Sequence, residues 1–253
     1  MSNKKQRIDK LLADRGITES RNIAQRLVMA GEVFVDGQLV HKPSEQFSEN
    51  CQITLAAQPR YVSRGGLKLE KAFADFNDIE IENKICADVG ASTGGFTDCL
   101  LKKGARKVYA IDVGYGQLHQ SLRGHDDVVV MERTNIKTVA TLPDEIDIVT
   151  IDVSFISLDR VFPIIKNWNK EKEMTVIALI KPQFEVGKKI AAEGKGVIRN
   201  PKHRQQAIDA VRAQAIGLGY KIHNMTKSPI QGPKGNIEYL LHLSYNPKIT
   251  EEG

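Results

Sequence analysis

The sequence predicts a doubly wound α/β domain with a mostly parallel sheet, preceded by a small N-terminal α+β domain. After residue 84, apolar runs rich in β-branched residues alternate with helical segments, which is typical of parallel βαβ units. The last two predicted strands are separated by about eight residues, too few for a helical crossover, so they should pair antiparallel. Before residue 59, two short helices precede a hairpin, and this change of pattern indicates a separate domain.

The N-terminal domain is expected over residues 1–58. The stretch RIDKLLADRG spaces its apolar residues for a helix that ends at Gly16, and Ser20 caps a second helix, RNIAQRLVMAG, that stops at Gly31. Asp36-Gly37 joins two apolar runs and is a strong hairpin signal, and CQITLA follows as a further strand. Basic residues stud the two helices, and from the residues alone they are most simply a solvated face; they include Arg7, Arg21 and Arg26.

A linker is expected at residues 59–63, because Pro59 cannot continue a strand ladder. The second domain is expected over residues 64–246, with a short tail at residues 247–253. Its first strands are predicted at residues 84–90, 107–113, 128–132, 146–153 and 175–182, with helical segments at FTDCLLKKG, near QLHQSL and at FISLDRVFPIIKNW. A long helix, PKHRQQAIDAVRAQAIGLG, then precedes the strands YKIHNMTKSP and IEYLLHLSY, the last of which should run opposite to the others.

The composition is that of a globular and modestly basic chain. Its 253 residues include 36 Lys and Arg against 31 Asp and Glu, a balance that fits a nucleic-acid partner without requiring one. The three cysteines lie far apart and give no metal-ligand spacing, so neither a metal site nor a disulfide framework is expected. The charged N-terminus lacks an apolar signal core and no apolar run is long enough to span a membrane, so we expect a cytoplasmic protein.

The stretch DVGASTGGFTD, from Asp88 to Asp98, fits two incompatible functions. Its G-x-S-x-G pattern matches the nucleophile elbow of serine hydrolases. A hydrolase also needs a histidine on a late loop, whereas His203 lies early in a predicted helix and His223 and His242 lie within predicted strands. The alternative is a glycine turn that holds a nucleotide-like cofactor between the first strand and the next helix, and this interpretation is favoured.

The type of cofactor follows from what the turn lacks. Ser92 stands where the dinucleotide fingerprint needs glycine, and no Walker lysine follows, so a pyrophosphate is not indicated. Asp112 ends the second strand 22 residues after Gly90, where an acidic side chain can bind ribose hydroxyls. A cofactor with a ribose but no pyrophosphate satisfies both facts, and S-adenosylmethionine is the candidate. Asp88 would face its ammonium group, and the glycine backbone would approach its carboxylate.

Four charged residues stand at the ends of otherwise apolar elements, all on one edge of the predicted sheet. Asp152 and Lys181 end parallel strands, whose carboxyl ends form the ligand edge of such sheets. Glu238 begins the reversed strand and Lys68 opens the helix before the first strand, so both start at the same edge. Singly, each would be an ordinary surface charge. Together, and beside a methyl donor, the four residues suit methyl transfer to a weakly acidic hydroxyl group. One of the lysines would take up or polarise the proton of that hydroxyl.

Longer motifs connect these positions. The N-terminal helices with the V-x-V-D-G hairpin resemble the S4 RNA-binding domain. The strings VSRGGLKL, DVGASTGGFTD, DVGYGQL, ERTN, DVSFISL, LIKPQFEVGK and GNIEYLL follow. With the S4 domain in front, the chain resembles the TlyA family of ribosomal RNA methyltransferases, in which an S4 domain is joined to an FtsJ-like (RrmJ-like) fold. The resemblance implies a Rossmann-like methyltransferase domain with a mostly parallel, seven-stranded sheet whose last strand is antiparallel.

The resemblance also implies the reaction and its residues. The family transfers a methyl group from S-adenosylmethionine to the ribose 2′-hydroxyl of a cytidine in ribosomal RNA, so ribosomal RNA or ribosomal subunits are the expected partners. A Lys-Asp-Lys-Glu tetrad falls on Lys68, Asp152, Lys181 and Glu238, with Lys181 in the leading role. Cofactor contacts are expected at Asp88, Gly90, Ser92, Gly94, Gly95, Phe96, Asp112, Asn135 and Asp152. The S4 resemblance implies that Arg7, Arg21 and Arg26 face RNA phosphates.

The substrate side is less sharply defined by the sequence. The family has a shorter type that modifies 23S RNA and a longer type that also modifies 16S RNA, and the complete first helix, residues 7–16, favours the longer type. Residues 184–204 are expected to form a mobile basic loop that closes over RNA phosphates. Tyr115 and Phe155 would either stack on a base or pack in the core. The basic residues expected to contact RNA here are Arg64, Lys188, Lys189 and Arg199.

Two other functions stay open at this point. The chain could be an S4-type RNA-binding protein with an inactive enzyme domain, or a membrane-active haemolysin. The intact tetrad disfavours the first function, and the missing export signal disfavours the second.

Overall fold

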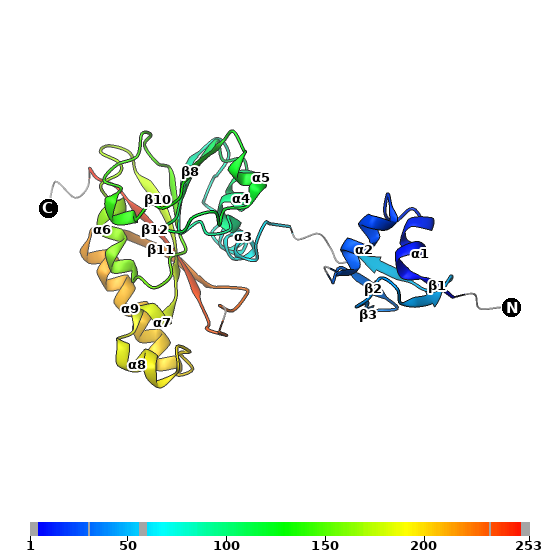
Figure 1. Cartoon of the computed structure of the whole chain (residues 1–253). Coiled ribbons are helices and arrows are strands. Elements are labelled where there is room, and N and C mark those ends of the chain that lie inside the picture. Colours follow the sequence, from blue (N-terminus) through cyan, green and yellow to red (C-terminus); the bar gives the residue numbers. More distant parts are fainter. Residues whose placement is uncertain (1–4, 30, 56–59, 233, 249–253) are drawn as a thin grey trace. The chain divides into compact units, whose positions relative to one another are not determined.

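The structure, a computed structural model, describes residues 5–29, 31–55, 60–232 and 234–248 (Figure 1). It divides into two compact units, Met1–Arg60 and Tyr61–Gly253. Pro59 of the expected linker and most of the expected tail lie outside the described residues. Each unit has its own hydrophobic core.

The N-terminal unit packs two helices against short strands. Its elements are β1 (Lys5–Arg7), α1 (Ile8–Asp14), α2 (Arg21–Met29), β2 (Val33–Val35), β3 (Gln38–Leu39), β4 (Gln46–Ser48) and β5 (Ile53–Leu55). Strand β2 pairs antiparallel with β3 and β5, while β1 pairs antiparallel with β4. Ile8, Leu12 and Val28 from the helices meet Val33 and Val35 from β2 in a buried apolar core.

Local signals in the N-terminal unit act as the sequence predicts. The Oγ atom of Ser20 accepts the N–H of Ile23 at 3.4 Å, which caps α2. Asp36 and Gly37 have φ values of 50° and 80°, the left-handed pair that a two-residue hairpin turn between β2 and β3 requires. The pairing of β1 with β4 was not predicted, because it joins segments far apart in the sequence and neither has a strong strand pattern.

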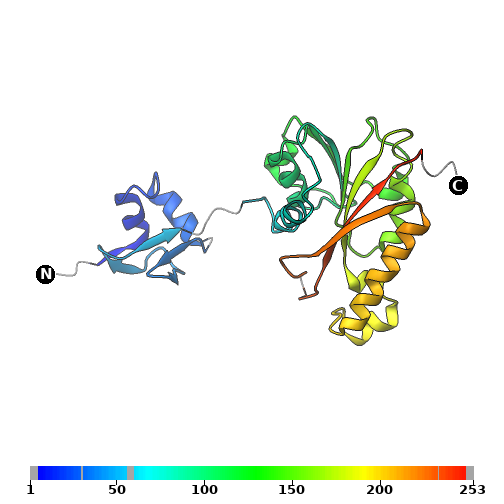
Figure 2. The same cartoon turned by 180° about the vertical axis from the view of Figure 1, so that it is seen from behind.

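The second unit is a mixed sheet with helices on both faces (Figures 1 and 2). The strand order β11-β12-β10-β9-β6-β7-β8 confirms the predicted seven-stranded sheet, in which β12 runs antiparallel to both β10 and β11. Its strands are β6 (Ile85–Val89), β7 (Lys107–Ile111), β8 (Val128–Met131), β9 (Ile148–Ile151), β10 (Met174–Ile180), β11 (Lys221–Lys227) and β12 (Tyr239–Tyr245). Its helices are α3 (Gly65–Asp75), α4 (Gly95–Lys102), α5 (Gln120–Arg123), η1 (Ile136–Thr138), η2 (Leu158–Arg160), α6 (Phe162–Ile165), α7 (Pro182–Glu185), α8 (Lys188–Glu193) and α9 (Pro201–Gly217).

The sheet separates two apolar layers. On one face, Leu69 of α3 and Leu100 of α4 pack with alternate strand residues such as Ile177. On the other face, Phe162 of α6 and Val211 of α9 pack with the remaining strand residues. All residues of the central strands β6 and β9 are buried, so the polar side chains that follow these strands gather at the carboxyl edge of the sheet.

Two predicted elements are wrong in detail. The segment at residues 155–168 forms only η2 and α6, with Pro163 in the first turn of α6, where its missing N–H leaves no helical hydrogen bond unmade. The segment at residues 184–204 is not a plain loop, since it contains the end of α7 and all of α8. Among the described residues, no helix has both the length and the apolar character that a membrane crossing requires.

Candidate active site

The glycine turn joins β6 to α4 at the carboxyl edge of the sheet. Gly90 and Gly94 have φ values of 88° and 97°, which side-chain-bearing residues rarely adopt. A Cβ atom on Gly90 would lie 2.5 Å from the backbone oxygen of Asp152, so the turn and the end of β9 approach each other closely. Gly95 faces a similar restriction, because a Cβ atom there would lie 2.2 Å from the Oγ atom of Ser63. The glycines therefore allow three segments to converge beneath the site.

Asp88 does not face the pocket, which corrects the expected contact with a cofactor ammonium group. Its side chain is fully buried at the end of β6. One carboxylate oxygen accepts the backbone N–H of Thr97 at 2.9 Å and its hydroxyl at 2.7 Å, and the other accepts the Thr150 hydroxyl at 3.1 Å. Asp88 therefore supports the first turn of α4 from inside the domain. Sequence could not show this, because the orientation of the carboxylate depends on partners from two other elements.

Burial raises the pKa of Asp88 to about 7, against the opposing effect of its hydrogen bonds. The folded chain then keeps this proton up to about pH 7, while an unfolded chain loses it near pH 4. The stabilisation is therefore complete below pH 4 and is lost as pH rises towards 7. Relative to Asp88→Asn, the wild-type free energy of unfolding is expected to fall by about 1.4 kcal/mol per pH unit between pH 5 and 7. Denaturant unfolding across this range checks it, and parallel curves for the two proteins would contradict it.

A pocket of about 480 Å³ opens over the ends of β6, β7 and β9. Asp112 and Asn135, two of the residues expected to contact the cofactor, line it together with Gly90 and Ser92. The Asp112 carboxylate accepts the backbone N–H groups of Ser92 at 2.8 Å and Gly114 at 2.7 Å, so it fixes the turn from the neighbouring strand. Asn135 begins η1, where its side chain accepts the N–H of Lys137.

Ser92 has none of the surroundings of a catalytic nucleophile. Its Oγ atom donates to the Oε1 atom of Gln117 at 3.4 Å. Among the described residues that line the two pockets at this edge, no histidine is present. These contacts disfavour the hydrolase interpretation, and Ser92 is a small residue in a left-handed turn conformation.

The four charged residues predicted at the sheet edge meet in one cluster. The Nζ atom of Lys68 lies 2.6 Å from a carboxylate oxygen of Glu238 and 3.9 Å from one of Asp152. The Nζ atom of Lys181 lies 2.5 Å from the other Asp152 oxygen. Both lysines are buried and Glu238 is only 1% exposed. All four residues line a second, larger pocket of about 750 Å³. Asp152 also lines the smaller pocket, so the two pockets share a wall.

Glu238 offers an acceptor to this pocket. Its Oε2 atom receives the Lys68 ammonium group, whereas its buried Oε1 atom has no hydrogen-bond partner among the described residues. A buried carboxylate oxygen without a donor is costly unless a ligand supplies one. The cluster therefore combines two lysine donors with an unfilled acceptor, which suits a substrate that carries hydroxyl groups.

Sequence reasoning missed two residues that shape the cluster. Lys181 donates to the Oγ atom of Ser154 at 2.9 Å, so Ser154 helps to orient the lysine. Asn236 is buried, donates to the backbone oxygen of Gly196 at 2.7 Å and accepts the N–H of Ile198 at 2.8 Å. It thus joins the segment before β12 to the segment after α8. Their positions two residues from Asp152 and Glu238 were the available signal.

The two aromatic side chains that could stack on a base, Tyr115 and Phe155, are both exposed, so the expected alternative of core packing is wrong for both. Phe155 is 92% exposed, lines both pockets and has a φ value of 66°, a strained conformation for a bulky residue. The Glu185 carboxylate anchors its loop by accepting the Ser157 hydroxyl and the Leu158 N–H. The exposed ring of Tyr115 lies 3.9 Å from the Arg133 guanidinium group.

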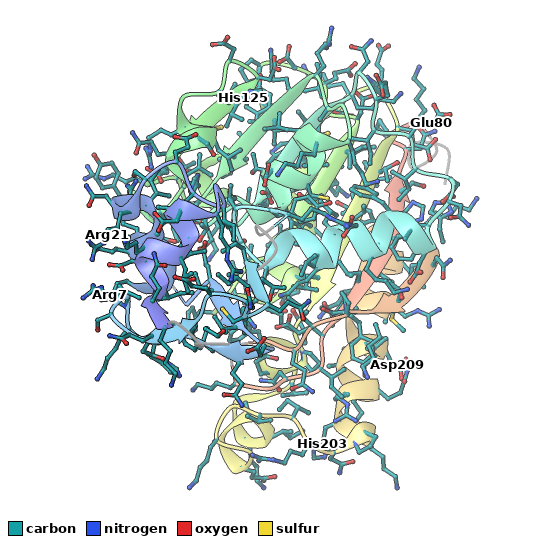
Figure 3. All side chains as sticks on the ribbon, turned by 90° about the vertical axis from the view of Figure 1, so that its right-hand side faces the viewer. Arg7, Arg21, Glu80, His125, His203 and Asp209 are labelled. Carbon is teal, nitrogen blue, oxygen red and sulfur yellow. The ribbon has the colours of Figure 1, made fainter. Side chains whose placement is uncertain are left out.

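The residues expected to bind RNA do not all lie at the pocket. Arg64 precedes α3 and lines the larger pocket. Lys189 in α8 and Arg199 before α9 are exposed, while the side chain of Lys188 lies outside what the structure describes. Of the cofactor candidates, Gly95 and Phe96 line the larger pocket, whereas Gly94 packs against Leu118 and Leu122 beneath it. Arg7, Arg21 and Arg26 belong to the other unit, with Arg7 and Arg21 at its surface (Figure 3).

Comparison with known proteins adds the family. The model for FtsJ-like methyltransferases matches residues 61–245, and the model for the S4 domain matches residues 6–53. The 16S/23S rRNA (cytidine-2′-O)-methyltransferase TlyA of Mycobacterium tuberculosis is 42% identical over 241 residues, which cover 94% of this chain and 89% of the relative. This chain belongs to the TlyA family of FtsJ-like methyltransferases.

Two further similarities agree with TlyA membership. The 23S rRNA (cytidine-2′-O)-methyltransferase TlyA of Campylobacter jejuni is 37% identical over 245 residues, which cover 90% of this chain and 95% of the relative. A solved structure from Streptococcus thermophilus, described as a candidate hemolysin, is 39% identical with a TM-score of 0.73, and the match covers 99% of this chain and 94% of that chain.

The cofactor of this TlyA-family methyltransferase is S-adenosyl-L-methionine, and the residues of the site fit it. The glycine turn packs its backbone directly against the end of β9, and its residues Gly90 and Ser92 line the smaller pocket. The smaller pocket ends at Asp112, whose carboxylate suits ribose hydroxyls, and at Asp152, which is shared with the charged cluster. Gly90, Ser92, Asp112 and Asn135 line this pocket, and we propose them as the residues that would hold the cofactor.

Proposed function

We propose that this chain methylates the ribose 2′-hydroxyl of a cytidine in ribosomal RNA, in the cytoplasm. The observation that carries the proposal is the buried cluster of Lys68, Asp152, Lys181 and Glu238 at the wall shared by the two pockets. The names of the relatives from M. tuberculosis and C. jejuni support the choice of substrate. The cluster contains the donors and acceptors that an attacking ribose needs, independently of those names.

The residues of the cluster have separable roles in the proposed reaction. S-adenosylmethionine supplies an electrophilic methyl group when bound. Lys181 Nζ, oriented by Asp152 and Ser154, hydrogen-bonds to the attacking ribose oxygen and stabilises the negative charge that develops on it as the oxygen–methyl bond forms, while the hydroxyl proton leaves to solvent. Lys68 keeps Asp152 and Glu238 in place, and the Glu238 Oε1 atom accepts a hydrogen bond from a ribose hydroxyl. Fixed placement of the reacting atoms supplies much of the remaining rate acceleration.

RNA binding is assigned to both units. In the second unit, Arg64 at the larger pocket and the exposed Lys189 and Arg199 contact phosphates, so affinity should fall as salt rises. The exposed ring of Phe155 stacks on a base next to the cluster. In the first unit, the S4 domain recognises a second segment of RNA. The substrate is 23S RNA, with 16S RNA as an additional substrate because the first helix is complete.

The proposed reaction can be tested directly. Wild-type chain, methyl-labelled donor and ribosomal subunits that lack the modification are expected to yield labelled 2′-O-methylcytidine from the large subunit. Digestion of each ribosomal RNA to nucleosides and chromatography identify the product and the subunit. Labelled product in another nucleoside, or none from either subunit, would overturn the proposal. Release of haemoglobin from red cells, measured on the same preparation, tests the haemolysin alternative.

A further inference from the structure

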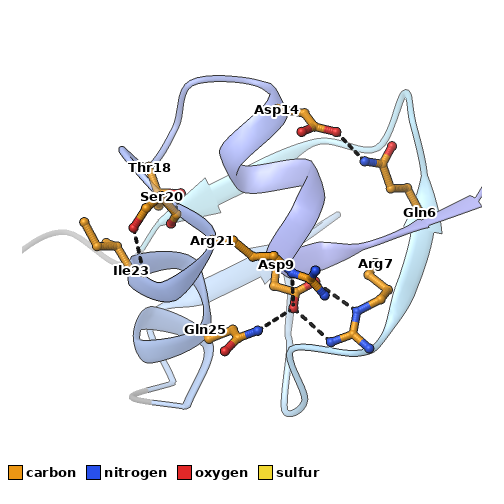
Figure 4. Close-up of polar contacts among 9 residues, drawn as sticks. All are labelled: Gln6, Arg7, Asp9, Asp14, Thr18, Ser20, Arg21, Ile23 and Gln25. Atoms are coloured by element: carbon orange, nitrogen blue, oxygen red, sulfur yellow. Dashed lines mark hydrogen bonds and ion pairs between the residues drawn. The ribbon is translucent and has the colours of Figure 1, made fainter.

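A buried carboxylate links α1 to α2 in the N-terminal unit. The Asp9 side chain in α1 is 0% exposed, and three side chains donate hydrogen bonds to it (Figure 4). Arg7 donates through Nε at 3.1 Å and Nη2 at 2.9 Å, as a two-pronged pair. Arg21 donates through Nε at 3.0 Å, and Gln25 donates through Nε2 at 2.8 Å. The pKa of Asp9 is held below its usual range, mainly by the hydrogen bonds from Arg7.

Asp9 holds the Arg7 and Arg21 side chains in place, but part of each guanidinium group stays exposed to solvent. Their side chains are 42% and 50% exposed, although the carboxylate that holds them is buried. Among the contacts of the described residues, Arg21 uses neither of its terminal nitrogens and Arg7 leaves Nη1 without a partner. Since Arg7 ends β1 just before α1 and Arg21 begins α2, one carboxylate sets the spacing of two guanidinium groups from different elements.

This arrangement suits recognition of phosphate. A guanidinium group binds phosphate through parallel N–H donors, and an arginine that is already held in place loses less conformational freedom on binding. Two arginines against one carboxylate leave a surplus positive charge at the surface. A purely structural link between α1 and α2 would not require the terminal nitrogens of Arg21 to remain available.

We infer that Asp9 is a positioning residue that holds Arg7 and Arg21 as a two-guanidinium clamp for backbone phosphates of ribosomal RNA. The inference rests on the proposed function, because it takes ribosomal RNA as the ligand of this unit. It adds an acidic residue to a surface whose basic residues alone were expected to bind RNA.

The RNA affinity of Asp9→Asn distinguishes a positioning role for Asp9 from an effect of its negative charge alone. If only charge matters, removing a carboxylate from a phosphate-binding surface raises the affinity for RNA. If Asp9 positions the clamp, affinity for transcribed, unmodified 23S RNA is expected to fall about tenfold, and the dependence on salt to weaken by about one unit of slope. Binding is measured with the full chain across a series of potassium chloride concentrations. Glu19→Gln removes an exposed carboxylate from the same unit and is expected not to weaken binding.

A second pair of variants keeps the test decisive if Asp9→Asn unfolds. Arg21→Lys preserves charge but cannot both pair with Asp9 and present two terminal donors, so its affinity is expected to fall several-fold. Arg212→Lys makes the same change at an exposed position of α9, outside the residues assigned to RNA, and is expected to bind as the wild type does. Equal affinities for these two variants would overturn the inference. Unchanged or raised affinity in a folded Asp9→Asn, or a wild type that does not bind the RNA, would overturn it too.

Kinetics separate the clamp from the catalytic cluster. In methyl-transfer assays, Asp9→Asn is expected to raise KM for RNA and to leave kcat at saturating RNA unchanged, because the clamp lies outside the cluster. A lower kcat with an unchanged KM would count against the clamp. Since the binding measurement needs no methyl donor, a wild type that binds RNA but transfers no methyl group would overturn the proposed function and leave the clamp standing.

Discussion

Lys181→Ala is expected to lower kcat for methyl transfer by roughly 10³-fold, with binding of S-adenosylmethionine retained. The variant removes the ammonium group 2.5 Å from Asp152 and 2.9 Å from the Ser154 hydroxyl. No other lysine of the cluster can replace it, because Lys68 is already paired with Glu238 at 2.6 Å. Single-turnover transfer to ribosomal RNA measures the chemical step, and calorimetry measures the cofactor affinity.

The matched control for Lys181→Ala is Lys234→Ala. Lys234 lines the same pocket but is exposed and lies outside the charged cluster. Its loss is expected to change KM for RNA with little effect on the single-turnover rate. If Lys181→Ala transferred label as fast as the wild type, the role assigned to Lys181 would be wrong.

Gly90→Ala is expected to weaken S-adenosylmethionine binding by about 100-fold or more, because even small displacements of a binding turn are costly. The added Cβ atom would lie 2.5 Å from the backbone oxygen of Asp152, and neither backbone segment can rotate away as a flexible side chain could. The residue would also have to keep a φ value of 88°. Relief of the collision must move the glycine turn or the end of β9, and both carry residues of the site.

The Gly116→Ala variant tests whether the steric collision or the strained backbone conformation explains the effect of Gly90→Ala. Gly116 also has a positive φ value, 68°, but a Cβ atom there would meet nothing within 4 Å. It should lose about 1 kcal/mol of stability and keep cofactor affinity close to that of the wild type. Equal losses of cofactor affinity in the two variants, measured by calorimetry, would show that strain rather than close approach explains the need for glycine at position 90.

The charged cluster could be predicted from the sequence because topology alone brings its members together. Asp152 and Lys181 follow parallel strands, and Glu238 precedes a strand that the short connection forces to run backwards. These rules depend on chain direction and not on side-chain detail. They place residues from distant parts of the sequence at one edge of the sheet, and the structure closes the distances to hydrogen-bond range.

What sequence could not predict depends on side-chain orientation or on weak local patterns. Asp88 sits where a cofactor ligand would be expected, yet Thr97 and Thr150 draw its carboxylate into the interior. Helix α8 is short, charged and bounded by Gly187 and Gly194, so its sequence lacks the apolar periodicity that predicts a helix. The left-handed backbone of Phe155 has no sequence signal, since bulky residues normally avoid it.

The reversed strand carries a residue of the charged cluster next to one edge of the sheet. Strand β11 pairs only with β12 among the described strands, so the two form a hairpin that docks on β10 as one piece. Glu238 enters the cluster with this hairpin, and its carboxylate is the near partner of Lys68. Local opening of the hairpin would therefore silence the enzyme while the remaining strands stay folded. We expect methyl-transfer activity to be lost when this hairpin opens, under milder conditions than those that unfold the whole domain.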